Sequence, residues 1–244
     1  MTLVELLVTL IAGALVIAGI FRLLLTTNSA YTTQEQLVDV NLNTQFASEY
    51  LSEALTQAGA DLPTEGMEVL ITRPSASTMS DTVTIKVNPT RAVASPLSDV
   101  AIGATQIPVL DAAPFAGDES LAIEHVLGAV TRVKLSSVNT AATPNLLVLA
   151  DALTVTVWAS AKIYGFSTEK YYRNGTDLCL NSTGSVIAEG ITKLECNYLD
   201  TAGAGPYRTC PWFKVKFARL NIAATMTNGK MTKTAETFVT FRNR

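Results

Sequence analysis

The chain has 244 residues, a formal net charge of −3 and a charged-residue content of 16%. Its Lys and Arg residues are scattered rather than clustered, so the sequence lacks the basic surface of nucleic-acid-binding domains, and no nucleic acid is predicted as a partner. The length admits one large domain or two modest ones, and the charged fraction lies below the roughly 25% of an ordinary soluble domain.

The first 25 residues form an almost uncharged apolar segment. Between Leu6 and Phe21 there is no charged residue, and Thr9 is the single polar side chain. About 25 helical residues at 1.5 Å per residue span roughly 38 Å, more than the ~30 Å hydrocarbon layer of a bilayer. We therefore expect residues 1–25 to cross a membrane. An acid precedes the apolar run and Arg22 follows it, which is not the pattern of a cleaved signal peptide.

Glu5 is the one acid inside this segment. A carboxylate in an apolar helix costs something like 2.5 to 3.5 kcal/mol on insertion scales, so it needs a cation. The N-terminal amine of an axially shifted neighbouring copy can supply one. Their attraction is on the order of 4 kcal/mol at ~4 Å and an effective dielectric constant of 20, before desolvation is subtracted. We expect assembly, and not folding, to satisfy Glu5.

The opening MTLVELLVTL resembles the mature start of type IV pilins and pseudopilins, whose pattern is Phe or Met, then Thr, Leu, a hydrophobe and Glu. The resemblance implies a precursor that a prepilin peptidase cuts before Met1, and N-methylation of Met1. It implies insertion in the inner membrane, then export by the pilus assembly machinery into a homopolymer or mixed pilin filament on the bacterial cell surface. Met1 and Glu5 would then direct assembly. The filament-core helix would include Leu3, Leu6, Leu7, Leu10, Gly13, Gly19 and Arg22.

Arg22 stands where many type IV pilins have a proline. In assembled pili of the family the helix often loses its regular hydrogen bonds just before that proline. Here Gly13 and Gly19 remain as weak points, each about 1 kcal/mol poorer than Ala in a helix. Arg22 is expected at the edge of the apolar span, and in a filament Asp39 or Glu35 of another copy are candidate partners.

From residue 26 to about residue 60 the helix is predicted to continue as an amphipathic one. Small or apolar residues recur at spacings of three and four, at Leu37, Val40, Thr44, Ala47, Leu51, Ala54, Leu55 and Ala58. Such a stripe can hold a globular head. The helix should end at Gly59, and Pro63 bars its continuation. A plain membrane anchor for an enzyme or binding module is the alternative, but the absence of a linker favours the pilin interpretation.

After the helix the pattern changes to β-strands. In the clearest strand, Val83, Ile85 and Val87 alternate with polar residues, which is typical of a half-buried strand. The predicted fold class is therefore α+β: a long N-terminal hydrophobic helix whose C-terminal half packs on an antiparallel, β-rich head of residues 61–244.

Three expectations concern details of this head. Residues 153–163 and 213–226 are predicted strands, and the second needs a bulge or bend near Ala218 and Arg219 because its apolar residues change parity there. Residues 92–161 form either an inserted subdomain or an extension of the same sheet.

The last third of the chain carries a second, weaker resemblance. The runs YYRNGTDLCL, VIAEGITKLECNYLD and FVTFRNR look like the heads of the PilW and PulJ group of minor pilins and pseudopilins. This resemblance implies a minor pilin, or a type II secretion pseudopilin, that primes or caps a filament. The main repeating subunit of a pilus stays the favoured interpretation. A tip adhesin or DNA-uptake subunit is a further alternative, with Tyr171, Tyr172 and Arg173 as the nearest candidate patch.

The three cysteines, Cys179, Cys196 and Cys210, all lie in this last third. One disulfide fits an exported protein. Cys196 with Cys210 is the predicted pair because the two flank a loop rich in Gly and Pro that could bring them together. Cys179 with Cys196 is the second choice, and three reduced, buried cysteines are the alternative.

The sequence offers little catalytic or metal-binding chemistry. His125 is the only histidine, no CxxC motif occurs, and no nucleophile-elbow pattern is present. No enzymatic activity, cofactor or metal is therefore predicted. Asn174 and Asn181 begin N-x-Ser/Thr triplets and are possible glycosylation sites.

Overall fold

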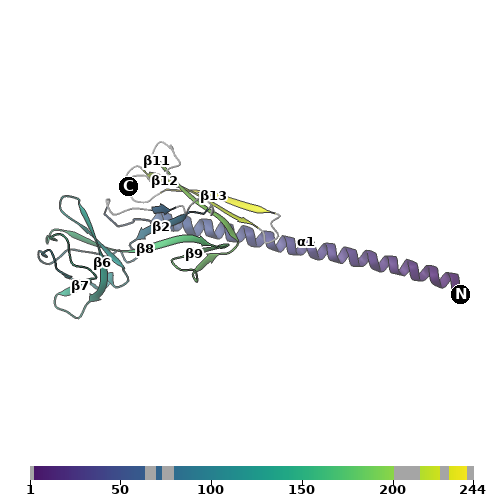
Figure 1. Ribbon diagram of the computed structural model, residues 1–244, viewed down its shortest axis with the longest axis horizontal. Coiled ribbons are helices and arrows are strands. Elements are labelled where there is room, and N and C mark those ends of the chain that lie inside the picture. The colour runs from purple at the N-terminus through teal and green to yellow at the C-terminus, as the bar shows by residue number, and fades with distance from the viewer. Residues whose placement is uncertain (1–2, 64–69, 73–79, 201–214, 226–230, 241–244) are drawn as a thin grey trace.

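The structure, a computed structural model, describes residues 3–63, 70–72, 80–200, 215–225 and 231–240. One long helix projects from a β-rich head, with the N-terminus at the free end of the helix (Figure 1). The fold is α+β, as the sequence predicted: a long apolar N-terminal helix packs on a largely antiparallel β-sheet domain.

Helix α1 (Leu3–Gln57) is a single 55-residue helix. It ends as predicted, because Gly59 has a φ of 71° that favours glycine. The Gly59 N–H donates to the carbonyl oxygen of Lys86 at 2.8 Å, which fixes the helix end to the first long strand. The last turn of α1 is therefore anchored in the head.

Only the C-terminal part of α1 packs against the head. Its first buried residue is Val40, and the buried stripe then recurs every three or four residues, as predicted. This stripe comprises Val40, Thr44, Ala47, Leu51, Leu55 and Ala58. From Leu6 to Glu35 every described side chain is exposed.

A three-stranded antiparallel sheet covers one side of α1. It has the order β11 (Ile191–Asp200), β12 (Val215–Thr225) and β13 (Thr232–Thr240). The helix packs mainly on β12 and β13. Alternate residues of these strands, including Leu220 and Ile222, join the helix stripe in one hydrophobic cluster, here called the inner core.

A larger, ten-stranded sheet links the inner core to the rest of the head. Its inner part contains β1 (Leu70–Thr72), β2 (Thr82–Val87), β9 (Asp177–Leu180) and β10 (Val186–Ala188). Its central strand is β8 (Lys162–Asn174). The C-terminal half of β8 pairs with β2, and Val83 and Ile85 of β2 are fully buried in the inner core.

The outer lobe is built around the N-terminal half of β8. It contains β3 (Val93–Ala94), β4 (Gln106–Val109), the 3-10 turn η2 (Ala113–Phe115), β5 (Ser120–Glu124), β6 (Val130–Asn139) and β7 (Asn145–Leu149). A second hydrophobic cluster, which includes Phe115, Leu121 and Leu147, fills it. Figure 1 places this lobe at the end of the head away from the N-terminus.

The two alternatives predicted for residues 92–161 describe different aspects of this lobe. Its cluster runs from Ala92 to Ile163 and is separate from the inner core. Its strands nevertheless continue the same sheet, in the order β1-β2-β8-β5-β6-β7-β4. The segment therefore has its own core and shares a sheet.

Two of the strand predictions need correction. Residues 153–161 form turns and an isolated bridge, and the strand β8 begins only at Lys162. The apolar residues Leu153 and Val157, which suggested a strand, are instead buried as loop residues in the outer cluster. The bulge predicted near Ala218 and Arg219 is also wrong there, since both pairings of β12 are regular at these residues. The register shifts in the β11–β12 pairing lie between Ile191 and Lys193 and between Leu199 and Asp200.

Candidate assembly site

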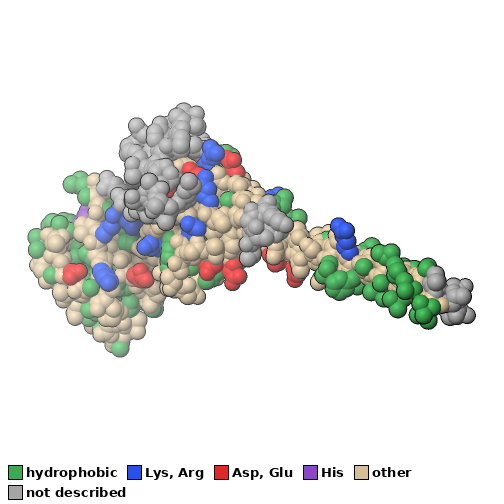
Figure 2. All heavy atoms as spheres, turned by 45° about the vertical axis from the view of Figure 1, so that its right-hand side comes forward, with side chains coloured by type: hydrophobic (Ala, Val, Ile, Leu, Met, Phe, Trp, Pro, Cys, Tyr) green, Lys and Arg blue, Asp and Glu red, His purple; other side chains and the backbone are tan. Residues whose placement is uncertain are grey.

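The projecting part of α1, from Leu3 to Glu35, is the most unusual surface of the molecule. Its leucines, isoleucines and valines are mostly more than half exposed, with Leu15 at 70% and Ile17 at 69%. The helix is long and apolar enough to cross a membrane, and none of its most apolar window is buried. Figure 2 shows hydrophobic side chains covering this part of the helix. Such a surface needs lipid or another protein to cover it.

The predicted filament-core residues lie on this projection. Each is exposed: Leu3, Leu6, Leu7, Leu10, Gly13, Gly19 and Arg22. The helix continues without a break through Gly13 and Gly19, and a Cβ on either would meet nothing within 4 Å. Both glycines therefore leave open surface for the backbone of a neighbouring helix.

Met1 and the side chain of Glu5 lie outside the part of the chain that the structure describes. The backbone of Glu5 lies near the start of α1. The predicted ion pair between Glu5 and a neighbouring N-terminus, and the methylation of Met1, stay predictions.

The threonine side chains of the projection bond to their own helix. Thr9 Oγ1 donates to the Leu6 carbonyl oxygen at 2.9 Å, and Thr26 and Thr27 donate to carbonyl oxygens four residues earlier, also at 2.9 Å. These hydroxyls thus have an acceptor in hydrocarbon, where an unmade hydrogen bond is costly. The threonines are compatible with an apolar environment.

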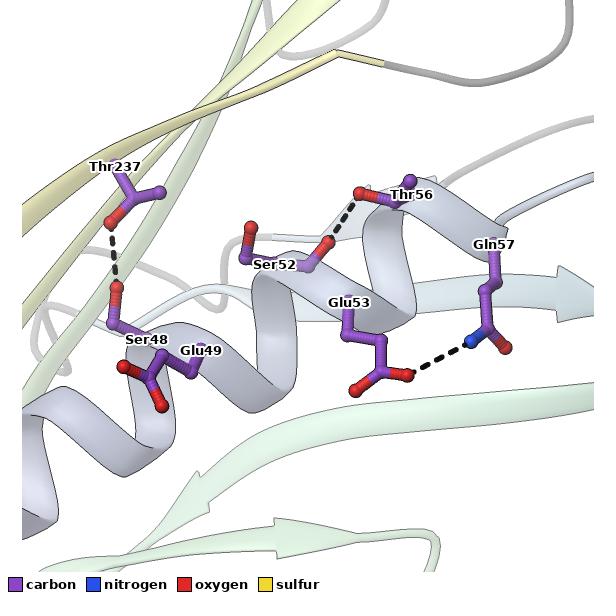
Figure 3. Close-up of a pocket in the computed structure, with 7 residues that line it drawn as sticks. All are labelled: Ser48, Glu49, Ser52, Glu53, Thr56, Gln57 and Thr237. Atoms are coloured by element: carbon purple, nitrogen blue, oxygen red, sulfur yellow. Dashed lines mark hydrogen bonds between the residues drawn. The ribbon is translucent and has the colours of Figure 1, made fainter.

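A polar groove runs along α1 where the helix meets β13 (Figure 3). It is lined by Ser48, Glu49, Ser52, Glu53, Thr56, Gln57 and Thr237. Ser48 and Thr237 share a hydrogen bond of 2.6 Å between their hydroxyl oxygens, which joins the helix to β13. Gln57 Nε2 donates to Glu53 at 3.3 Å. Hydroxyl, amide and carboxylate groups suit water or a polar peptide segment, and the lining contains no histidine or cysteine.

Within the outer lobe, the segment before β5 lies close against Gly165 of β8. The carboxylate of Asp118 covers this glycine so closely that a Cβ there would lie 1.8 Å from Asp118 Oδ2. Thr90, which follows β2, donates to the same oxygen at 3.3 Å, while Asp118 Oδ1 is buried without a hydrogen-bond partner among the described residues. Burial raises the pKa of Asp118 to about 6, against the opposing effect of the Thr90 bond.

A buried polar contact attaches the start of β2 to β11. The N–H of Asp81 donates to the Leu194 carbonyl oxygen at 2.7 Å, and Asp81 Oδ2 accepts from the Cys196 N–H at 3.0 Å. Asp81 is only 1% exposed. Because a buried backbone N–H needs a partner, this carboxylate fixes how the two sheets meet around α1.

The cysteine predictions need correction. Cys179 and Cys196 are both free, buried thiols, so neither the Cys196–Cys210 pair nor the Cys179–Cys196 pair is present; Cys210 itself lies outside the described residues. Cys196 belongs to the inner core on β11, whereas Cys179 lies on β9 of the other sheet. Burial, assisted by Asp81, raises the pKa of Cys196 to about 12, and burial also raises that of Cys179. Both thiols are therefore protonated and unreactive at neutral pH.

Other residues singled out from the sequence lie apart from α1's projection. Asn181 Oδ1 accepts from the Lys170 N–H at 2.7 Å, a bond that does not use Nδ2, the atom to which a glycan is attached. Asn174 is exposed at the end of β8, opposite Asp177. Glycosylation at either site stays a prediction.

His125 shares a 2.9 Å hydrogen bond with Thr131, and among the described residues no group of His, Cys, Asp and Glu could hold a metal ion.

No protein-family model matches the sequence, and a search of curated proteins finds no match. The function is therefore inferred from the geometry of the chain itself.

Proposed function

We propose that this chain is the structural subunit of a type IV pilus-like filament, held in the inner membrane before assembly and polymerised through its N-terminal helix. One observation carries the proposal. The apolar projection is continuous with the helix on which the head is built, because α1 runs unbroken from Leu3 to Gln57.

A tether would look different. An anchored enzyme or binding module needs no fixed orientation relative to its anchor, and flexible linkers commonly join the two parts. Here the Leu51 and Leu55 side chains of α1 are fully buried in the inner core, so the head cannot turn independently of the projection. This rigid connection suits a subunit whose helices must pack in register with those of its neighbours.

The energetics of the projection favour burial among copies once it leaves the bilayer. Covering a fully exposed Leu, Ile or Val side chain is worth about 1.5 to 3 kcal/mol. Many such side chains lie on the projection, among them Leu15, Ile17 and Leu23, which are 67% to 70% exposed. Bundled helices replace the lipid that covered them. Glu5 then neutralises the N-terminal amine of a neighbouring subunit.

The test compares filament yield with the amount of protein in the membrane. We expect Glu5→Val to reduce sheared surface filaments at least about tenfold, because it removes the carboxylate that neutralises a neighbour's N-terminal amine. The unassembled chain should still accumulate in the membrane, since the substitution removes a charge that costs something like 2.5 to 3.5 kcal/mol in hydrocarbon. Thr9→Val is the matched control on the same helix and should assemble like the parent. Normal assembly of Glu5→Val, or an N-terminal peptide by mass spectrometry that does not begin with methylated Met1, would refute the proposal.

A minor or tip subunit is a second candidate, favoured by the outer lobe. Eight of the eleven exposed large hydrophobic side chains of the described head lie there, including Leu110, Leu127 and Trp158. Such a lobe suits contact with another protein or a surface at the filament end. The chain as the dominant band of purified filaments supports the repeating subunit, whereas a trace ratio supports the minor one. Restriction of the chain to the periplasm would support a secretion pseudopilin.

A further inference from the structure

The face of α1 opposite the head carries apolar side chains that are more than half exposed. Tyr31, Val38, Leu42 and Phe46 are 67%, 54%, 60% and 52% exposed. At about 3.6 residues per turn these four residues fall on one side of the helix, away from the stripe of Val40, Ala47 and Leu51 that the head buries. We call these four, with the acids among them, the back face.

Four acids accompany the back face, and two of them lack partners. Glu49 accepts from Gln45 Nε2 at 2.9 Å, and Glu53 accepts from Gln57 Nε2 at 3.3 Å. Glu35 and Asp39 are exposed, lie one helical turn apart, and have no hydrogen bond or ion pair with any described residue. Glu35 is the last residue of the projection, and Asp39 follows it by one helical turn.

Arg22 is the only cation in the sequence of α1, against five acids. It is exposed and has no partner among the described residues. By helical periodicity Arg22 lies on the side of α1 that carries the head further along, together with Ile11, Leu15 and Leu25, which lie eleven and seven residues before it and three residues after it. The projection therefore presents an apolar face with one positive charge, and the back face presents an apolar face with unpaired negative charge.

We infer that the back face of α1 is the docking surface for the projection of a second copy, with Arg22 of one copy bound by Glu35 and Asp39 of the other. This rests on the proposed function, since it requires parallel copies. In a filament with heads outside, the back face of each helix points inward, and the head-side face of a neighbour's projection points outward. The two faces therefore meet.

The charges fix the stagger between the two copies. Arg22 precedes Glu35 by 13 residues and Asp39 by 17, so pairing requires an axial offset of about 20 to 26 Å at 1.5 Å per residue. The same offset places Leu25 of one copy beside Val38 or Leu42 of the other. The Glu5 contact needs only about 6 Å, so it involves a different neighbour. A guanidinium between two carboxylates in a dry interface is a strongly directional contact.

Lipid is a poorer occupant for the back face. Carboxylates are costly in hydrocarbon, and Glu35 and Asp39 alternate with the apolar residues rather than lying beyond them. A helix that brings its own guanidinium satisfies both kinds of group at once.

Charge reversal in the full chain tests the inference. We expect Arg22→Glu, and the double variant Glu35→Arg with Asp39→Arg, each to reduce surface filaments at least about tenfold. Combining the three substitutions should restore them to within about threefold of the parent. Glu53→Arg is the matched control, because its carboxylate already bonds to Gln57, and it should assemble normally. The head should keep its unfolding midpoint in every variant, since residues 22, 35 and 39 are exposed.

The outcomes separate this inference from the proposed function. Absence of filaments in the parent would refute the filament role itself. A parent that assembles, together with reversed variants that assemble equally well or a combination that fails to recover, would overturn the pairing and leave the filament role standing. If the Arg22→Glu variant is depleted from the membrane, rather than from filaments, Arg22 binds lipid headgroups. That outcome would also overturn the pairing.

Discussion

The two halves of α1 belong to one continuous helix but have opposite surroundings. Leu15 in the projecting half is 70% exposed, whereas Leu51 in the other half is fully buried under the three-stranded sheet. Hydrophobicity alone does not distinguish the two leucines. The difference shows that the head covers only the part of the helix on which an amphipathic stripe exists, and that the apolar part must find its cover outside the chain.

The largest expected effect comes from removing the same side chain in each half. Leu51→Ala should lower the free energy of unfolding by about 3 to 5 kcal/mol, because it leaves a cavity in the inner core. Leu15→Ala should change it by less than ~0.5 kcal/mol, because that side chain contacts nothing in the head. Denaturant unfolding of the detergent-solubilised chain measures both. Equal losses would mean that the projection packs on the head in solution.

A carboxylate in the outer lobe sharpens the comparison between covered and uncovered groups. Asp118 is half-buried with a pKa raised to about 6. A raised pKa means that the folded state favours the protonated acid. The stabilising contribution of protonated Asp118 is therefore present below pH ~4 and is lost as the pH rises through 6. Full linkage would give roughly 3 kcal/mol, which solvent screening at this partly exposed site reduces to about 1 kcal/mol.

Asp118→Asn should therefore be more stable than the parent by about 1 kcal/mol at pH 7.5 and about equal to it at pH 4. The measurement is the unfolding midpoint of both proteins across this range. Glu119→Gln, at the exposed neighbouring position, is the control and should follow the pH dependence of the parent. An Asn variant with the parent's pH dependence would exclude Asp118 as the titrating group.

The smallest expected effect concerns serines in the two halves of α1. Ser48 is 5% exposed and shares its hydrogen bond with Thr237 of β13. Ser48→Ala should cost about 1 kcal/mol of unfolding free energy, because Thr237 loses its partner next to the core. Ser29→Ala, on the exposed projection, should be neutral or slightly stabilising, because Ala is the better helix former. A similar cost for both serines would contradict the role assigned to the Ser48–Thr237 bond.

Local sequence patterns were sufficient to predict several elements of the fold. The three-and-four spacing of the stripe predicted which residues of α1 are buried, and Gly59 marked its end, because helix periodicity and chain termination depend on neighbouring residues alone. The alternation at Val83, Ile85 and Val87 likewise identified β2. The small strands β3, β4, β9 and β10 escaped prediction because their two to four residues carry too little periodicity.

The sequence by itself determined that this chain has a membrane-length apolar helix that continues into the stripe holding a β-rich head, since both follow from residue order along one helix. Only the tertiary structure decided that β8 serves two separate cores, that Cys179 and Cys196 lie buried and free on different sheets, and that Asp118 closes over Gly165. These depend on contacts between residues far apart in the chain, for which local periodicity holds no information. The sequence already offered Glu35 and Asp39 as candidate partners of Arg22, but only the packing of the head showed that both acids lie on the side of α1 that the head leaves open.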